Sequence, residues 1–446
     1  MKRLDRAISK GIKKETHPKA VVKCYPTYVQ DLPEGNETGK YLALDIGESV
    51  SNFRVLMINF TTEGCDMLSE IYPIAQPLLN RPGVELFDYV AQCLADFVHK
   101  YHTGKEKLEL GLSFSFPVNQ TALNEGVLVK WTKGFNCAGV VGRDVVTMLR
   151  EAVDRQQKVN IKIVALLNDS TGCLVSCAYK HQDCKIGVII DSGFNACYVE
   201  KSDNVTTFSN VNNKPFVIVN TEWGAFGEDG RLDFLLTEFD WALGTTTGGW
   251  NLPNFERMVA GTYLGELVRV IMKKLTRERL ILNGTGSKQL FTTGIITTED
   301  VITVVTSAKG NLSICRKFLY ERLGLPHATT EDCIDFNYIC TLVAMRSAHL
   351  VSAGVACLVN RTSFNPITVG LDGSLYMNHP LYHDWIQAKV PALLKSPREL
   401  KLVLSQYGRG RGAAFLSAVC AKELVREKKT TNSGSIGERK TLSQRP

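Results

Sequence analysis

The order of apolar and polar positions predicts short strands and longer helices along the whole chain. Helical spacing of apolar positions predicts helices over 142–157, 254–280 and 332–360, a charged helix in the first 23 residues, and a last helix ending near residue 428. Mostly apolar runs predict β-strands at 41–47, 53–60, 108–116, 127–131, 161–167, 186–190, 196–199, 367–371 and 400–404. Strands interspersed with helices are typical of an α/β protein.

One strand–turn–strand pattern occurs twice. Asp45-Ile-Gly47 lies between the first two predicted strands, and Asp191-Ser-Gly193 lies between the strands at 186–190 and 196–199. A unit that is used twice suggests two related lobes. The same three residues are common in ordinary hairpin turns, so the repeat alone leaves both interpretations open.

The composition excludes several classes of protein. Of the 446 residues, 44% are hydrophobic and 22% are charged, which is typical of a globular chain and not of a disordered, collagen-like or coiled-coil one. The length suggests two or three lobes. Apolar runs stay well below the roughly 18 residues that a membrane span needs, so we expect no membrane-spanning segment.

Cysteine usage and charge indicate the environment of the protein. The thirteen cysteines form no CxxC pair, and no apolar signal core follows Met1, so we expect reduced thiols in the cytoplasm. The net charge of +7 belongs to the two ends, because residues 1–23 carry eight positive and two negative charges and residues 422–446 carry seven positive and three negative ones. We interpret both ends as solvated termini and expect no nucleic-acid partner.

Two groups of residues are candidates for chemistry. Gly408, Gly410 and Gly412 lie between a predicted strand and a predicted helix, where backbone N–H groups can approach an anion; a tight turn explains them equally well. A second group offers the amides and carboxylates that a polyol needs, although surface polarity and helix capping also fit. This group comprises Ser115, Thr132, Lys133, Asn168, Asp169, Asn195, Glu222 and Glu256.

A series of segments, in the same order along the chain as in a known family, supports the polyol-binding interpretation of the second group. The segments are KKETHPKAVVK (13–23), LGLSFSFPVNQ (110–120), LVKWTKGF (128–135), VALLNDSTG (164–172), NACYVE (195–200), EWGAFGEDG (222–230), MVAGTYLGELVR (258–269), RSAHLVSAGVACLVNR (346–361), VGLDGSLY (369–376) and GRGAAFLSAVCA (410–421). Together they resemble the animal hexokinase family over about residues 12–425. The resemblance implies ATP-dependent phosphorylation of a hexose, such as glucose, at its 6-hydroxyl, the first step of glycolysis.

The resemblance also implies a fold. This is the α/β, two-lobed actin-like ATPase fold, related to ribonuclease H, in which a small and a large lobe close on sugar and ATP. We expect an N-terminal helix and lead-in over 1–40, a small lobe over 41–167 and a large lobe over 168–428, whose final helix packs back toward the small lobe. We expect a disordered tail over 429–446 and, because the length matches one unit, a monomer.

Roles carry over residue by residue. The polar group that runs from Ser115 to Glu256, here called the hexose set, matches the family's sugar-binding positions. Asp169 matches the catalytic base, which takes the proton of the acceptor hydroxyl. Lys133 can balance charge near the transferring group. The phosphate set matches the family's ATP-binding positions and comprises Asp45, Gly47, Asn52, Arg54, Ser192, Gly193, Thr292, Asp372, Gly373, Ser374, Ser405, Gly408, Gly410 and Gly412. The resemblance assigns no direct metal ligand; Mg²⁺ would come with ATP, through water near Asp45 and Asp191.

The phosphate loops depart from the family pattern. The first usually reads D-[LI]-G-G-T-N-F-R, and here Glu48 and two added residues follow Gly47, so phosphates should be held less well. The second usually reads G-T-G-S-N, and here it reads D-S-G-F-N over 191–195; Asp191 would either oppose phosphate or meet the hydrated magnesium. Arg411 replaces the usual Lys of the adenosine-side loop, and Pro253 alters the stretch before Glu256.

Two functions follow from these observations. The first is an active ATP-dependent hexokinase. The alternative is a catalytically weak or inactive hexokinase-like glucose sensor. The retained Asp169 favours the enzyme, and the altered loop at 47–52 favours the sensor. A structural actin-like filament protein is a third class, but it would not need the hexose set.

Overall fold

The structure, a computed structural model, describes residues 1–47, 51–104, 106–210, 212–246, 254–306, 312–405 and 408–423. The insertion in the first phosphate loop at 48–50, the altered stretch at 247–253 and the expected tail at 429–446 lie outside the described residues. Contacts divide the chain into two compact units. Unit 1 comprises Met1–Tyr25, Lys185–Pro215 and Val219–Gln406, and unit 2 comprises Pro26–Cys184, Phe216–Ile218 and Tyr407–Pro446.

The division by contacts places two helices in another unit than the lobe that we expect from the sequence. The chain passes from unit 2 to unit 1 at Cys184, whereas the expected boundary lies at 167/168. Helix α4 (Asp169–Lys180) therefore groups with the sheet that precedes it. The helix over 408–423 groups with the same sheet.

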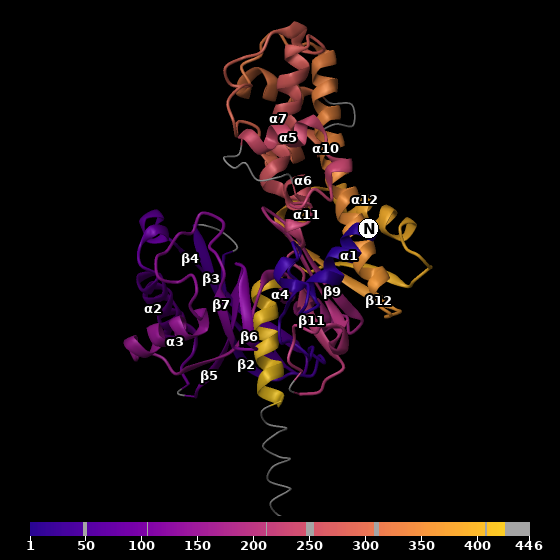
Figure 1. The fold of residues 1–446 in the computed structure, drawn as a ribbon. Helices are drawn as coiled ribbons and strands as arrows, with labels where there is room; N and C mark the ends of the chain where they lie inside the picture. Colours follow the sequence, from indigo (N-terminus) through magenta and orange to yellow (C-terminus); the bar gives the residue numbers. More distant parts are fainter. Residues whose placement is uncertain are drawn as a thin grey trace, which may run out of the picture. The chain divides into compact units, whose positions relative to one another are not determined.

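Unit 2 is built on a five-stranded sheet in the order β4-β3-β2-β5-β8 (Figure 1). Strand β2 pairs antiparallel with β3 and parallel with β5, and β5 pairs parallel with β8. The elements are β2 (Gly39–Ile46), β3 (Asn52–Thr61), β4 (Gly64–Pro73), the 3-10 turn η2 (Gln76–Asn80), α2 (Gly83–Tyr101), β5 (Leu108–Phe114), a hairpin of β6 (Val118–Ala122) and β7 (Glu125–Leu128), α3 (Val145–Gln156), β8 (Ile161–Leu167), α4 and the helix over 408–423.

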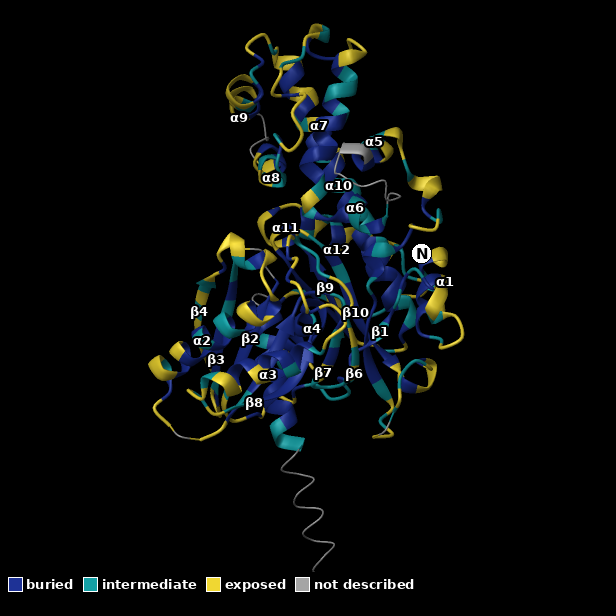
Figure 2. Cartoon of the chain, turned by 60° about the vertical axis from the view of Figure 1, so that its left-hand side comes forward, coloured by how far each residue is buried: buried dark blue, intermediate teal, exposed yellow. Residues whose placement is uncertain are grey.

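Alternate residues of the central strands bury both faces of this sheet, as the two-residue period of a strand requires. Leu42 and Leu44 of β2 belong to the core that α2 and α3 complete. The opposite face receives the helix over 408–423, where the ring of Phe415 lies 5.2 Å from that of Phe60 on β3. Strand β4, at the edge, is mostly exposed or half-buried (Figure 2).

Glycines let the helix over 408–423 approach its neighbours. A Cβ added at Gly412 would lie 2.0 Å from the carbonyl oxygen of Gly172 on α4, and one added at Gly111 on β5 would lie 2.1 Å from that of Ala413. A Cβ at Gly410 would lie 2.7 Å from Leu56 Cδ1. Residues 408–412 are already helical, so this part of the chain is not the loop that the sequence predicts. Close packing accounts for Gly410 and Gly412.

A six-stranded sheet in the order β1-β11-β10-β9-β12-β13 lies mostly in unit 1. Several helices of this unit extend beyond one end of the sheet (Figure 1). Strands β9 and β10 form an antiparallel hairpin, and β12 and β13 pair in parallel. The strands are β1 (Tyr25–Pro26), β9 (Cys184–Ile190), β10 (Phe194–Lys201), β11 (Phe216–Asn220), β12 (Ile367–Asp372) and β13 (Leu400–Leu404). The helices are α1 (Lys2–Gly11), α5 (Glu238–Thr246), α6 (Phe255–Val259), α7 (Gly261–Arg277), α8 (Thr298–Thr306), α9 (Ser313–Lys317), α10 (Thr330–Arg361), α11 (Ser374–Asn378) and α12 (Tyr382–Ala392). Short turns are η1 (His17–Lys19), η3 (Ser202–Asn204), η4 (Trp223–Ala225), η5 (Asp233–Leu235), η6 (Leu282–Gly284) and the π-turn η7 (Phe318–Arg322).

Both repeated strand–turn–strand patterns are antiparallel hairpins, as predicted. Asp45 of β2 pairs with Arg54 of β3, and Ile190 of β9 pairs with Phe194 of β10. The helix predicted over 254–280 is instead two helices, α6 and α7. The chain turns at Ala260, which has extended dihedral angles (φ −67°, ψ 147°), and the next N–H, of Gly261, donates to the carbonyl of Asp191 (2.7 Å).

Helix α10 qualifies the expectation about membranes. Among the described residues it is one helix whose length and composition would let it cross a membrane, although 67% of its most apolar stretch is buried inside the molecule. It contacts α6, α7, α8, α9 and α12. Burial of this kind is how a long apolar helix behaves in the core of a folded unit.

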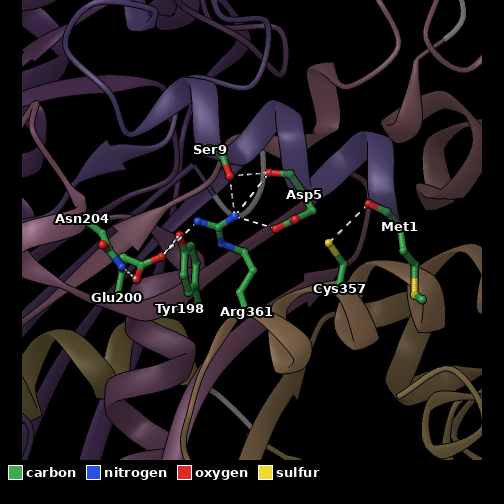
Figure 3. Close-up of polar contacts among 8 residues, drawn as sticks. All are labelled: Met1, Asp5, Ser9, Tyr198, Glu200, Asn204, Cys357 and Arg361. Atoms are coloured by element: carbon green, nitrogen blue, oxygen red, sulfur yellow. Dashed lines mark hydrogen bonds and ion pairs between the residues drawn. The ribbon is translucent and has the colours of Figure 1, made fainter. Parts of the chain in front are cut away.

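The N-terminal helix α1 is fastened to unit 1 by a buried charge cluster (Figure 3). Its apolar face buries Leu4 and Ile8. Arg361, the last residue of α10, donates to Asp5 Oδ1 (2.6 Å), to Ser9 Oγ (2.8 Å) and to Glu200 Oε2 (3.2 Å) at the end of β10. Glu200 also accepts from the side chains of Tyr198 and Asn204 (2.8 Å each). The cluster, here called the Arg361 cluster, therefore joins α1, α10 and β10.

All thirteen cysteines are free thiols. Twelve are buried and Cys65, on the edge strand β4, is half-buried. Burial raises the pKa of the Cys357 thiol to about 11 and that of Cys420 to about 12, so both thiols stay protonated at neutral pH. The absence of disulfides agrees with the reduced thiols that the sequence predicts.

Candidate active site

The catalytic candidate of unit 2 lies at the start of α4. Asn168 caps the helix, because its Oδ1 accepts from the N–H (3.2 Å) and the hydroxyl (2.6 Å) of Thr171. Asp169 is the first helical residue and is 8% exposed. Its Oδ1 accepts from the N–H of Ser170 (2.8 Å), so the start of the helix orients the carboxylate.

Two further segments of the hexose set in unit 2 are held by aromatic packing. Ser115 follows β5, and among the described residues its buried hydroxyl has no hydrogen-bond partner. The ring of the next residue, Phe116, lies 4.8 Å from that of Trp131. Thr132 and Lys133 follow Trp131 directly. The packed rings thus fix the segments on which Ser115 and Thr132 stand.

Lys133 connects the two sets inside unit 2. Its backbone is left-handed (φ +54°), and its Nζ donates to the carbonyl of Gly47 (2.8 Å) in the first phosphate loop. Gly47 has φ +94°, and a Cβ there would lie 2.7 Å from the ring of Phe116. The ammonium group is therefore held beside the loop that the sequence assigns to phosphate.

The hexose residues Asn195 and Glu222 of unit 1 are hydrogen-bonded to each other, and Glu256 bonds to the backbone next to Asn195. Asn195, the second residue of β10, donates from Nδ2 to Glu222 Oε1 (3.2 Å) and to Asn220 Oδ1 (2.9 Å). Asn220, at the end of β11, donates to the same Glu222 oxygen (2.8 Å). Glu256 on α6 accepts at Oε2 from the N–H of Phe194 (3.2 Å). Sequence reasoning missed Asn220, although it is polar and stands at a strand end two residues before Glu222.

The two carboxylates of this group influence nearby phenols. Burial, together with the charge of Glu222, raises the pKa of Tyr25 to about 12. Burial and the charge of Glu256 raise the pKa of Tyr263 in the same direction. Both phenols therefore stay neutral at physiological pH, beside carboxylates that can accept hydrogen bonds from a polyol.

The phosphate residues of unit 2 lie around the first hairpin. Asp45, at the end of β2, is 3% exposed and accepts from the hydroxyl of Ser113 (2.8 Å), a residue that sequence reasoning missed. Arg54 is its partner across the hairpin, and Asn52 begins β3. The start of the helix over 408–423 lies close by, because a Cβ at Gly410 would be 3.5 Å from that of Asp45.

Unit 1 brings a second group of phosphate residues around Asp191. The loop of Ser192 and Gly193 is braced by Thr262, whose hydroxyl donates to the carbonyl of Ser192 (2.7 Å). Asp191 Oδ1 accepts from the N–H (3.4 Å) and the hydroxyl of Ser374, the first residue of α11. The loop 372–374 thus meets the loop 191–193.

The remaining phosphate residues of unit 1 occupy three positions. Gly373 has φ +117°, and a Cβ there would lie 2.3 Å from the carbonyl oxygen of Ile190, so only glycine fits. Asp372 is buried and accepts from the N–H of Gly373 (2.8 Å), and Ser405 donates from its N–H to Leu371 (2.8 Å). Thr292 makes its side-chain bond within its own turn, to the carbonyl of Lys288 (2.9 Å).

The carboxylates of the phosphate set are compatible with magnesium that binds through water. In the described ranges, no group of three or more His, Cys, Asp and Glu side chains is arranged to hold a metal ion. The carboxylates of Asp45 and Asp191 each accept a hydroxyl hydrogen bond, which shows how they would accept from a coordinated water. Mg²⁺ keeps several waters when it binds phosphates, so this donor set fits it.

Comparisons with known proteins give a consistent result. Two family models, both described as Hexokinase, match residues 1–179 and 185–419. Hexokinase-2 of Equus caballus is 41% identical over 429 residues, which are 94% of this chain and 46% of that protein. Hexokinase-2 of Homo sapiens is 40% identical over 433 residues, with the same two shares. The chain thus spans about half the length of these curated relatives.

A solved structure matches over most of both chains. It is the hexokinase from Schistosoma mansoni complexed with glucose, which is 36% identical, with a TM-score of 0.86 and coverage of 94% of each chain. The likeness confirms the α/β fold with two mixed sheets that the resemblance implies.

Proposed function

Because this chain belongs to the hexokinase family, we propose that it transfers the γ-phosphoryl group of ATP to the 6-hydroxyl of a hexose such as glucose. The observation that carries the proposal is that Asn195 is hydrogen-bonded to Glu222, while Glu256 accepts from the N–H of Phe194, the residue before Asn195. The amide and the two carboxylates match the hydroxyls of a sugar. That the similar structure from Schistosoma mansoni contains glucose supports the choice of substrate.

The proposed reaction assigns a separate task to each part of the site. Asp169 takes the proton of the 6-hydroxyl as that oxygen attacks the γ-phosphorus, and the bond to the leaving ADP breaks. Lys133 holds a positive charge beside the first phosphate loop. When bound, Mg²⁺ would neutralise phosphate charge, and Asp45 would meet it through water.

The test is formation of hexose 6-phosphate by the purified full chain with glucose and Mg-ATP. We expect product in a coupled dehydrogenase assay, together with glucose binding measured by calorimetry without ATP. Protein that binds glucose and forms no product would overturn the enzyme proposal and favour the sugar sensor.

The sensor is a second candidate because of one contact. Asp191 accepts from both the amide and the hydroxyl of Ser374, so a carboxylate of the protein already uses donors that the resemblance assigns to phosphate binding. A fixed negative charge at that position opposes nucleotide phosphates.

Replacing Asp191 with glycine, the usual family residue, therefore has a defined expected result. We expect Asp191→Gly to lower the KM for ATP by about threefold to tenfold, because removing a like charge near phosphate is worth roughly 1 kcal/mol. Steady-state kinetics at saturating glucose measure the effect.

Asp191→Asn is the matched control, since it removes the charge and keeps a hydrogen-bond acceptor for Ser374. Both variants should bind ATP more tightly than the natural chain. An increased KM for ATP, or a greater requirement for Mg²⁺, would instead assign Asp191 to the hydrated metal.

We also propose a cytoplasmic location and a monomer. The thirteen free thiols support a reducing compartment, because disulfides form readily in oxidising ones. Size-exclusion chromatography with light scattering would test the oligomeric state.

A further inference from the structure

Three aromatic side chains form a buried cluster in unit 1. Phe194 begins β10, Trp223 begins η4 and Phe255 begins α6, and each is at most 4% exposed. The ring of Phe194 lies 5.0 Å from each of the other two, and those two lie 5.7 Å apart. The tilted and edge-on angles between the rings are those of favourable aromatic packing.

Each member of this cluster is the chain neighbour of one residue of the hexose set. Phe194 precedes Asn195, Trp223 follows Glu222, and Phe255 precedes Glu256. Adjacent Cα atoms are a fixed 3.8 Å apart, so the packing of the rings sets the spacing of the three polar neighbours. In each of three separate segments, a buried aromatic residue therefore stands next to a residue of the hexose set.

Two details show that the cluster fixes orientation as well as spacing. The N–H of Phe194 donates to Glu256 Oε2 (3.2 Å), so the backbone of one ring residue orients the carboxylate beside another. Glu222 has a left-handed backbone (φ +51°), which a residue with a side chain adopts only when its surroundings hold it. The fully buried side chain of Trp223, the next residue, restrains the backbone of Glu222.

Helix α10 leaves room for the cluster. A Cβ added at Gly354 would lie 2.9 Å from Trp223 Cη2 and 3.5 Å from Phe255 Cζ, so any larger residue would push the rings. The rings thus rest on the backbone of the longest described helix, which is a rigid support.

Phe194 is the member of the cluster that this chain does not share with the usual family pattern, which has Ser at this place in G-T-G-S-N. We propose that Phe194 is a positioning residue of the hexose site, whose ring completes the cluster and sets the mutual placement of Asn195, Glu222 and Glu256. The inference rests on the proposed function only for the nature of the ligand. In this chain, buried aromatic packing would thus position the residues that bind the sugar.

The test compares two leucine substitutions in the full chain. Phe194→Leu keeps an apolar side chain and removes the ring contacts. Phe336→Leu is the matched control, because Phe336 is also fully buried in unit 1 and also packs on another ring, that of Phe318 at 5.4 Å. Glucose Kd by calorimetry without ATP, kcat, KM and thermal unfolding are measured for both variants.

We expect Phe194→Leu to raise the glucose Kd and KM by about tenfold, because small misplacements of ligands weaken binding strongly. We expect kcat to fall less than KM rises. Phe336→Leu should lower the unfolding temperature to a similar extent and change the glucose Kd by no more than about twofold, as for a distant independent site.

Each result decides the proposal. An unchanged glucose Kd in Phe194→Leu, or an equal loss of affinity in Phe336→Leu, would overturn it. Failure of the enzyme proposal can be distinguished from failure of this inference. If the natural chain binds glucose without forming product, the glucose Kd values of the two variants can still be compared with its own. A natural chain that binds no glucose would overturn both.

Discussion

Replacing Asp169 with alanine is expected to lower kcat by about a thousandfold or more and to weaken glucose binding by no more than about tenfold. The carboxylate is the proposed acceptor of the hydroxyl proton, and general bases contribute roughly this much to a rate. In the proposed site most of the sugar contacts would come from other members of the hexose set, including Glu222 and Asn195, and these remain in the variant. Product formation and calorimetric binding measure the two effects separately.

Two further variants make this test specific. Asp169→Asn keeps the shape and an oxygen for the N–H of Ser170 but cannot take a proton, so it should lose as much activity as the alanine variant. Asp144→Ala removes another acidic residue at a helix start of unit 2, where Asp144 caps α3 through Thr147. It should cost about 1 kcal/mol of stability and leave kcat unchanged. Activity in Asp169→Asn near that of the natural chain would contradict the role of a base.

Replacing Arg361 with methionine is expected to lower the free energy of unfolding of unit 1 by about 3–5 kcal/mol. The Arg361 and Glu200 side chains are only 12% and 7% exposed, and Arg361 Nη2 lies 3.2 Å from Glu200 Oε2. Removal of the cation leaves a carboxylate in a buried place without its charged partner, which costs more than the pair contributes when intact. Urea unfolding followed by far-UV circular dichroism measures the loss.

Controls separate this effect from a general loss of arginine. Arg155→Met removes an exposed pair with Asp88, whose side chains are 44% and 41% exposed, and should cost less than about 1 kcal/mol. Adding Glu200→Gln to Arg361→Met should recover part of the loss, because a neutral amide is less costly to bury than a charge. Equal destabilisation by Arg155→Met and Arg361→Met would contradict the prediction, because burial of the Arg361 cluster would then make no difference to the free energy of unfolding.

Much of the backbone could be predicted because its pattern is local. The two hairpins at Asp45 and Asp191 follow from apolar runs on either side of short turns. The break between α6 and α7 could not be predicted, since it depends on a hydrogen bond from Gly261 to Asp191, far away in the sequence. The helical state of residues 408–412 was missed for a similar reason, because the glycines there serve contact with Gly172.

The site was less accessible to sequence reasoning than the fold. Spacing alone could not gather Asn195, Glu222 and Glu256, which stand on a strand, before a short turn and on a helix. Only the family resemblance suggested that they belong together. In unit 1 a hydrogen bond joins Asn195 to Glu222, and Glu256 accepts from the N–H of Phe194, the residue before Asn195. Asn220 and Ser113 were overlooked because their partners are visible only in three dimensions.

The number of cysteine thiols that react with a reagent reports how far the protein has unfolded. With twelve thiols buried and Cys65 half-buried, a polar reagent that cannot enter the folded chain has one accessible target. The reagent should consume one equivalent per chain in the native state and thirteen after complete unfolding. Intermediate values would count the thiols of whichever unit opens first, so reagent stoichiometry can follow the order in which the two units lose their structure.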